Sequence, residues 1–498
     1  TRNKMMHDTL ILCCHEGVKD TKQAFGNLFS QVDYLCKAHG IKVADKIAIQ
    51  TMRRHSNSQE PLSSEDLKYD ARALAIFISA VFGVDVPHEL NVLIPHTNRP
   101  YQKGLEINNR RIRCIVKNWD SDFIRVDIDQ DADEEEYLVQ LKDEENHIDH
   151  TYLWDILKEG MQLNLLDCQV KQPVITPRLI VVEPDYLVDI SSIATCFTAF
   201  GHHPLLYLLN QMKPRANTQA TLLGNFAGAA LDDIINTNGK YQMNETIKTN
   251  FREKALEFCT CPWFDAKKFY TDANQQAFNL QQVVDILFPR TASQAQMSAF
   301  RGESLYDRKK AILEPSFVCE ALGIQGRVDL MTTDCKLLVE QKSGRNMNIE
   351  THQVDPGYHS YQLEPHYVQL LLYYGVLQHN FKLSNDRVNI RLLYSKYQPQ
   401  DGLMVVAYYQ KLFKEAIEYR NQLVAASFEI AKEGFEHALN EFTPEVLNVA
   451  GTQDFFYNKY LKPQIEAITN PLHNLTPLEE AYFCRMMTFV LREQMISK

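Results

Sequence analysis

The sequence has no apolar run long enough to cross a membrane. Its longest candidate, 368–377, is shorter than a membrane span and is interrupted by polar side chains. The first residues also lack the basic and then apolar pattern of a secretory signal peptide. We therefore expect a chain that has no membrane partner.

Two other signatures are missing. No G-x-x-x-x-G-K-[ST] motif occurs, so no P-loop motor is recognisable in these residues. The 11 cysteines are odd in number and scattered, mostly inside apolar segments, which does not suggest a disulfide framework. Free thiols persist in a reducing compartment, so the cysteine pattern predicts a cytoplasmic protein.

The composition is that of a globular chain with several domains. Its 498 residues are 45% hydrophobic and 23% charged, and this length suggests about two to four domains. The net charge of −11 at first disfavours a nucleic-acid partner. Charge distribution decides where a polyanion binds, however, and basic residues cluster locally at 110–113 and at Arg345.

Composition and periodicity divide the chain into four regions. Residues 1–95 are predicted to be helical, since 24–38 and 69–82 carry apolar residues at three- and four-residue intervals. Residues 96–175 are β-rich and predict a small barrel-like module, with 118–121 as a hairpin turn. Residues 176–410 mix strands and helices. Residues 411–498 are helical, either as a stalk leading to a further module or as a dimerisation surface.

The most informative stretch carries two carboxylates on neighbouring predicted strands. Gly326–Asp329 ends in one carboxylate, and an apolar strand ends in Glu340, Gln341 and Lys342. Side chains alternate along a strand, so Glu340 and Lys342 share one side. A tight turn at 334–335 places the strands side by side and brings Asp329 near Glu340.

Phosphodiester hydrolysis explains such an arrangement. Oxygen ligands from Asp329, Glu340 and the main-chain carbonyl of Gln341 suit Mg²⁺, which keeps several of its waters. Lys342 could then orient the attacking water or neutralise charge on the phosphate in the transition state. The alternative is a plain hairpin with an exposed aspartate and an ordinary Glu–Lys surface pair.

A helix predicted over 365–374 favours the first interpretation. It places Gln369 and Tyr373 four residues apart on one face. The sequence of motifs is G-x-x-D at Gly326–Asp329, E-x-K-S-G at Glu340–Gly344, and Q-x-x-x-Y at Gln369–Tyr373. In this order it resembles the RecB-like branch of the PD-(D/E)XK nucleases, and most closely the nuclease domain of flap-trimming replication helicase–nucleases.

The resemblance implies a fold and a function. It implies an α/β PD-(D/E)XK (restriction-endonuclease-like) core with a mixed sheet over 176–410. It also implies Mg²⁺- or Mn²⁺-dependent hydrolysis of DNA, single-stranded or flapped, in replication, repair, recombination or defence. Asp329, Glu340, Lys342, Gln369 and Tyr373 are then the catalytic residues. A helicase module in the same or a partner chain is the implied protein partner.

The chain departs from the family at two places. The first family motif is G-x-x-x-H, and the position of the metal-ligating histidine is Gly228 here, with Asp232 one helical turn on as a substitute ligand. Glu314, on the strand before G-x-x-D, is a further candidate. The family often has a cysteine before a proline as the first ligand of an iron–sulfur cluster, where this chain has His203–Pro204. We expect no iron–sulfur cluster.

The basic residues define a candidate contact surface for nucleic acid. Arg110, Arg111 and Arg113, together with Tyr101 and Trp119, could bind a single strand through phosphate contacts and stacking, and Arg345 lies beside the proposed catalytic centre. A packing module is the alternative for this region. For the whole chain, the alternative to a nuclease is a catalytically degenerate nuclease-fold module that binds DNA or scaffolds a helicase. The Gly228 substitution favours this alternative.

Overall fold

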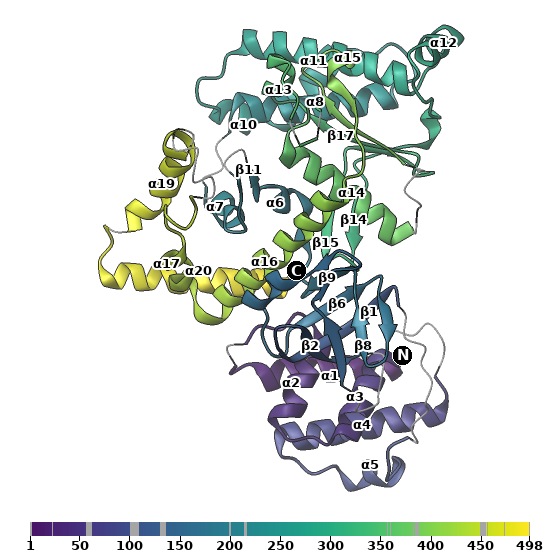
Figure 1. Ribbon diagram of the computed structural model, residues 1–498, viewed down its shortest axis with the longest axis vertical. Helices are drawn as coiled ribbons and strands as arrows, with labels where there is room; N and C mark the ends of the chain where they lie inside the picture. Colours follow the sequence, from purple (N-terminus) through teal and green to yellow (C-terminus); the bar gives the residue numbers. More distant parts are fainter. Residues whose placement is uncertain are drawn as a thin grey trace.

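The computed structural model arranges the chain as consecutive parts along one long axis. The N-terminal helices lie at one end and the larger α/β part at the other, while the C-terminal helices project sideways between them (Figure 1). The structure describes residues 2–21, 23–55, 62–99, 109–129, 136–198, 201–213, 217–355, 357–358, 360–381, 383, 388–448, 455, 457–472 and 474–497.

The first part is helical. Helix α4 begins with a capping box, in which Ser63 and Asp66 each accept a hydrogen bond from the other's backbone N–H, and it ends at Gly83 in the left-handed conformation with φ 65°. Leu10, Val32 and Phe77 pack into one shared apolar core. The helices are α1 (Arg2–Val18), α2 (Leu28–Ala38), α3 (Val43–His55), α4 (Ser64–Phe82) and α5 (His88–Leu93).

The second part is a twisted sheet whose strands run in the order β7-β8-β3-β2-β1-β6-β9. Alternate residues of β1, namely Ile112, Cys114 and Val116, are buried in its core. The sheet ends at β7 on one edge and at β9 on the other, and its closure into a barrel stays a prediction. The elements are β1 (Arg111–Trp119), β2 (Phe123–Ile128), β3 (Tyr137–Gln140), β4 (Lys142–Asp143), β5 (Ile148–Asp149), η1 (Thr151–Asp155), β6 (Gln162–Leu166), β7 (Gln169–Lys171), β8 (Val174–Thr176) and β9 (Leu179–Val182).

The third part confirms the expected mixed α/β class. Its main sheet has the order β13-β16-β17-β18-β19, with β17 and β18 parallel and the other neighbours antiparallel. A smaller sheet has the order β10-β15-β14. The strands are β10 (Val188–Asp189), β11 (Phe197–Thr198), β12 (Gly201–His202), β13 (Ala311–Leu313), β14 (Ser316–Cys319), β15 (Ile324–Arg327), β16 (Leu330–Thr332), β17 (Leu337–Lys342), β18 (Asn389–Tyr394) and β19 (Leu403–Val405).

Helices cover both faces of the main sheet. On one face α8 and α11 share an apolar core with Leu337 and Val339 of β17, and on the other face α14 shares a second core with Leu338. The helices of this part are α6 (Ile190–Ala194), α7 (Leu206–Met212), α8 (Gln219–Asn236), α9 (Met243–Glu253), α10 (Ala255–Thr260), α11 (Ala266–Leu287), α12 (Ala292–Phe300), η2 (Arg308–Lys310), α13 (Met347–Thr351), α14 (Glu364–Phe381) and α15 (Pro399–Gly402).

The C-terminal part attaches through α16, which crosses from the α/β part to the edge of the β-rich sheet (Figure 1). Asn421 of α16 accepts from the N–H of Val182 at 2.9 Å and donates to the carbonyl of Ile180 at 2.7 Å. The side chain thereby satisfies backbone groups of the edge strand β9. The elements are α16 (Gln410–Glu433), α17 (Phe435–Glu441), the π-helical turn η3 (Tyr457–Leu461), α19 (Lys462–Leu472) and α20 (Pro477–Ser497).

No helix within the described residues combines the length and the apolar character that spanning a bilayer requires.

The contact between α14 and α16 depends on Gly375, and we predict that Gly375→Ala lowers the free energy of unfolding by about 1–3 kcal/mol. A Cβ atom there would lie 2.4 Å from the Phe413 ring, which is itself buried. Gly228→Ala is the matched control, because it is also a helix-interior glycine but nothing lies within 4 Å of its added Cβ. Alanine at 228 should stabilise the helix by up to about 1 kcal/mol. Urea titrations of both variants measure the difference, and equal effects would contradict the packing argument.

Candidate active site

Three predicted residues meet on the α14 side of β17. Leu338 faces α14, and because side chains alternate, Glu340 and Lys342 face the same way. The Lys342 ammonium lies 2.8 Å from Oε1 of Glu340 and donates to Oε1 of Gln369 at 2.9 Å. The strand and the helix thus join E-x-K to the glutamine of Q-x-x-x-Y.

Tyr373 contacts the other predicted strand. Its hydroxyl donates to the main-chain carbonyl of Arg327 at 2.6 Å. A Cβ atom on Gly326 would lie 2.9 Å from the Tyr373 ring, so the glycine of G-x-x-D makes room for this tyrosine. Burial, with the nearby charge of Glu340 as the next cause, raises the pKa of Tyr373 well above its usual range. A neutral hydroxyl is therefore held on β15.

Asp329 lies in the link between β15 and β16 rather than within a strand. Its Oδ2 accepts a hydrogen bond of 2.6 Å from the backbone N–H of Gln341. This bond holds the Asp329 carboxylate at the end of β17, because Gln341 lies between Glu340 and Lys342 in the sequence. The turn at 334–335 forms as predicted, with Cys335 at φ 53°.

The two carboxyl groups share a desolvated environment. Glu340 is 2% exposed. Burial, and then the charge of Asp329, raises the pKa of Glu340 to about 8 against the opposing effect of Lys342. Burial also raises the pKa of Asp329, against the hydrogen bond from Gln341. Oε2 of Glu340 is buried without a hydrogen-bond partner, which is a costly state for a carboxylate oxygen.

Two more carboxylates lie near this pair. Glu314 is half-exposed and forms an ion pair of 3.1 Å with Arg327. Burial, followed by the charges of Glu314 and Asp329, raises the pKa of Asp232 to about 6. Within the described ranges, no three His, Cys, Asp or Glu side chains lie close enough together to hold a metal ion by themselves. Any cation here would need ligands besides carboxylates.

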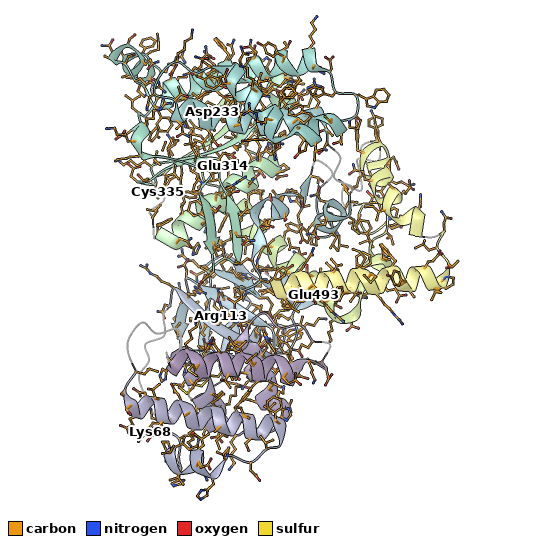
Figure 2. All side chains as sticks on the ribbon, turned by 180° about the vertical axis from the view of Figure 1, so that it is seen from behind. Lys68, Arg113, Asp233, Glu314, Cys335 and Glu493 are labelled. Atoms are coloured by element: carbon orange, nitrogen blue, oxygen red, sulfur yellow. The ribbon has the colours of Figure 1, made fainter. Side chains whose placement is uncertain are left out.

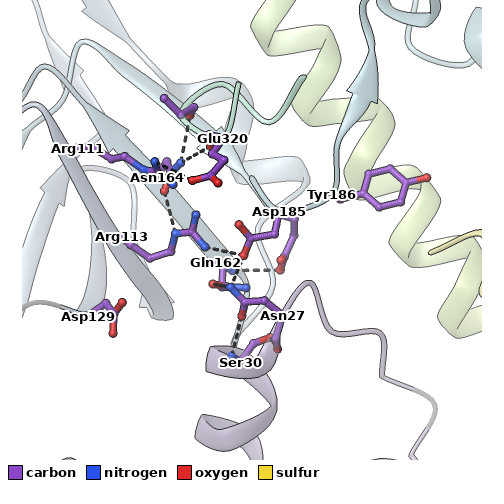
Figure 3. Close-up of polar contacts among 12 residues, drawn as sticks. Asn27, Ser30, Arg111, Arg113, Asp129, Gln162, Asn164, Asp185, Tyr186 and Glu320 are labelled. Carbon is purple, nitrogen blue, oxygen red and sulfur yellow. Dashed lines mark hydrogen bonds and ion pairs between the residues drawn. The ribbon is translucent and has the colours of Figure 1, made fainter. Parts of the chain in front are cut away.

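Two of the three predicted arginines of the β-rich part, Arg111 and Arg113, form ion pairs within the chain. Figure 3 shows Arg113 pointing toward Asn164 and Asp185, to which it donates at 3.0 and 2.6 Å. Arg111 lies 3.5 Å from Glu320, a residue of the α/β part. Arg111 therefore links the β-rich part to the α/β part, and Arg113 links β1 to β6 and to the segment that follows β9. Arg110 is exposed.

Arg345 and Tyr101 also belong to the predicted nucleic-acid surface. Arg345 is exposed and forms an ion pair with Glu350 of α13. Tyr101 lies outside the described residues. The structure does not bring Arg345 and the arginines of β1 together, since one belongs to the α/β part and the others to the β-rich part (Figure 1).

A polar network behind β17 was missed in the sequence. Gln341 donates to Oγ of Ser395 at 2.8 Å, and Ser395 donates to Gln276 of α11. Gln276 in turn donates to the carbonyl of Ser343 at 3.0 Å. The network fixes the end of β17 from the face opposite α14. The Asn/Gln-rich run at 274–282 was the available signal for this network.

A scan of protein-family models finds no match to this chain, and a search of curated proteins finds no significant match.

Proposed function

We propose that the chain is a cation-dependent nuclease of the RecB-like PD-(D/E)XK type that hydrolyses DNA. The observation that carries the proposal is the contact of Lys342 with both Glu340 and Gln369, beside a buried Glu340 oxygen that has no partner. A strand and a helix separated in sequence supply these groups in the order that the motifs predict. The mixed sheet with helices on both faces supports the corresponding fold.

The residues present fit a divalent cation. A buried carboxylate oxygen without a hydrogen-bond donor is suited to a cation, and oxygen donors match Mg²⁺ or Mn²⁺. Asp329, Glu340 and the main-chain carbonyl of Gln341 would hold the ion. When bound, it would supply charge stabilisation at the phosphate and acidify a water molecule.

Three side chains around the proposed cation site, Lys342, Gln369 and Tyr373, have the remaining roles. Glu340 and Gln369 orient the Lys342 ammonium, so that its positive charge is fixed before substrate arrives. Gln369 accepts from Lys342 without adding negative charge, which leaves the ammonium available to a phosphate oxygen. Tyr373 holds β15, and with it the start of the Gly326–Asp329 segment, in position.

The resemblance favours single-stranded or flapped DNA as substrate, and replication, repair, recombination or defence as the cellular process. It also favours a helicase module as partner, while the cysteine pattern favours the cytoplasm as location. A catalytically degenerate module that binds DNA is the second candidate. The open space at Gly228, where the family has a ligating histidine, favours that candidate.

The test is a cleavage assay on labelled single-stranded DNA with Mg²⁺, with Mn²⁺ or with a chelator. A nuclease gives products in at least one metal and none with chelator, because the carboxylates alone cannot supply the needed positive charge. Binding without products in either metal would favour the degenerate module. A parallel RNA substrate separates DNA specificity from general nuclease activity.

A further inference from the structure

A histidine precedes the Q-x-x-x-Y motif on α14. His366, Gln369 and Tyr373 are spaced by three and four residues, so their side chains share one face of the helix. Gln369 accepts a hydrogen bond from the Lys342 ammonium at 2.9 Å. The Tyr373 hydroxyl donates to the last residue of β15. His366 therefore lies one turn before Gln369, on the face of α14 that contacts the proposed catalytic centre.

A hydrogen bond also holds this histidine next to Lys342. Lys342 of β17 and Tyr394 of β18 are partners in the parallel register of the two strands. Paired residues of neighbouring strands point to the same side of a sheet, which here is the α14 side. The Tyr394 hydroxyl lies 3.0 Å from Nδ1 of His366. Adjacent side chains of the sheet therefore contact side chains of the helix that are one turn apart. The other face of the sheet is covered by α8, whose Asp233 lies among the helices in Figure 2.

The Tyr394 hydroxyl determines which nitrogen of His366 carries the proton. Its oxygen accepts from the backbone N–H of Leu363 at 3.0 Å. Nδ1 of His366 is the only acceptor that the described part of the chain offers to the hydroxyl hydrogen. Burial, and then the charge of Lys342, lowers the pKa of His366 to about 4, so the ring is neutral at neutral pH. A neutral ring that accepts at Nδ1 carries its proton on Nε2, which is then a donor.

This Nε2–H group is available to a ligand. Among the described residues, none forms a hydrogen bond with Nε2 of His366, and the atom is not one of the fully buried polar atoms without a partner. Solvent therefore reaches it. The side chain of Lys342 is 21% exposed, so solvent also reaches the ammonium end of the centre. A charged and a neutral donor, held by neighbouring elements, match the several oxygens of one phosphate.

We propose that His366 is a further catalytic residue of the centre, whose Nε2–H donates a hydrogen bond to a non-bridging oxygen of the DNA phosphate that Lys342 contacts. The inference rests on the proposed function. Negative charge develops on these oxygens during hydrolysis, and a donor that is oriented before the substrate binds stabilises this charge without reorganisation. Tyr394 is a positioning residue, because it orients the ring and selects the tautomer without reaching the phosphate.

Two substitutions separate the roles of the two ring nitrogens. In His366→Asn the side-chain oxygen can replace Nδ1 as the acceptor for Tyr394, but no donor reaches the position of Nε2. In His366→Gln the longer side chain brings an amide N–H near that position. We expect His366→Asn to lower the single-turnover rate of cleavage of labelled single-stranded DNA by about 10–100-fold. Rescue by glutamine should limit the loss to about fivefold.

His379→Asn is the matched control. His379 is a half-buried histidine of the same helix, and burial lowers its pKa as well. It lies about 20 Å of helix rise beyond His366, outside the proposed centre. We expect this variant to change the cleavage rate by less than about twofold. Thermal melting of the full chain checks that each variant is folded.

Tyr394→Phe tests the positioning role. It removes the hydroxyl that orients His366, so we expect the cleavage rate to fall by about 3–10-fold. In the His366→Asn background the same change should have almost no further effect, because the donor is already absent. Equal losses in both backgrounds would show that Tyr394 acts on the fold alone and would count against the inference. If His366→Asn does not fold, an unchanged cleavage rate in Tyr394→Phe would overturn the inference.

Binding of labelled single-stranded DNA in chelator, followed by fluorescence polarisation, separates the inference from the proposed function. If the wild type cleaves DNA and His366→Asn cleaves it equally fast, the inference is overturned and the nuclease stands. If the wild type binds but cleaves nothing, weaker binding by His366→Asn and normal binding by His366→Gln would support the phosphate contact and count against the nuclease. Equal losses with asparagine and glutamine would overturn the inference, since the donor would not be what matters. A wild type that binds no DNA would overturn both.

Discussion

Replacing Glu340 with glutamine is expected to lower the rate of DNA cleavage by about 10³-fold while leaving the fold intact. The substitution keeps the shape of the side chain and a carbonyl oxygen for Lys342, but it removes a charged ligand from the proposed cation site. Single-turnover cleavage of labelled DNA measures the effect. Glu350→Gln is the matched control, since Glu350 pairs with Arg345 and Lys396 at the surface outside the proposed ligand set. Loss of activity in both variants would contradict a specific role for Glu340.

Glu340→Gln should also change how the stability of the protein depends on pH. The pKa of Glu340, 4.5 for an ordinary side chain, is raised to about 8 by burial and by Asp329. Between these values the folded, cation-free chain keeps a proton that the unfolded chain releases. The contribution of this group therefore makes stability fall as pH rises from about 4.5 to about 8. Glutamine cannot titrate, so Glu340→Gln should remove that fall. Melting temperatures at pH 5.5 and pH 8 with chelator test this, and an identical pH dependence in both proteins would contradict it.

Replacing Arg420 with methionine is expected to lower the free energy of unfolding by at least about 3 kcal/mol. The guanidinium is fully buried and donates to the carbonyls of Glu183, Tyr186 and Gly323 at 3.0, 2.7 and 3.2 Å, and also to Val182. Methionine keeps most of the volume but no donor, so these carbonyls lose partners away from water. Each unsatisfied buried group costs about 1–3 kcal/mol.

The control for this effect is Arg492→Met on α20. Arg492 is exposed, and its Nε donates to the carbonyl of Ala431 at 2.6 Å, so water can replace it. We expect a loss below about 1 kcal/mol there. Denaturant titrations of both variants provide the comparison. Because Arg420 joins the β9 end, the β15 region and α16, its loss should also broaden the transition. A small effect, comparable to that of Arg492→Met, would show that the four carbonyls find other partners.

The sequence predicted the local part of the candidate site well. The alternation of apolar and polar residues places Glu340 and Lys342 on one side of β17, and the four-residue spacing places Gln369 and Tyr373 on one face of α14. Both patterns depend on neighbours a few residues apart. The predicted strand over 326–331 is interrupted at 328–329, so Asp329 lies in the link between β15 and β16, where its carboxylate accepts a hydrogen bond from the backbone N–H of Gln341.

The long-range pairing of the arginines was not predicted from the sequence. Arg111 and Arg113 form ion pairs with Glu320 and Asp185, residues far along the chain, and their contact with nucleic acid stays a prediction. Arg420 lies in a helix pattern typical of a solvated stalk and is instead among the largest fully buried side chains. The sequence around a charged residue does not indicate which distant partner the side chain will contact once it is buried.

By itself, the sequence determined the strand alternation, the helix faces and the order of the motifs, because hydrogen-bonding geometry fixes these over short distances. Only the tertiary structure decided that Glu340 is buried with one oxygen unpartnered, that α8 is open at Gly228, and that Gln276 supports β17 from behind. These features depend on how separate elements pack, and packing is set by shape and desolvation across the whole chain rather than by any one segment.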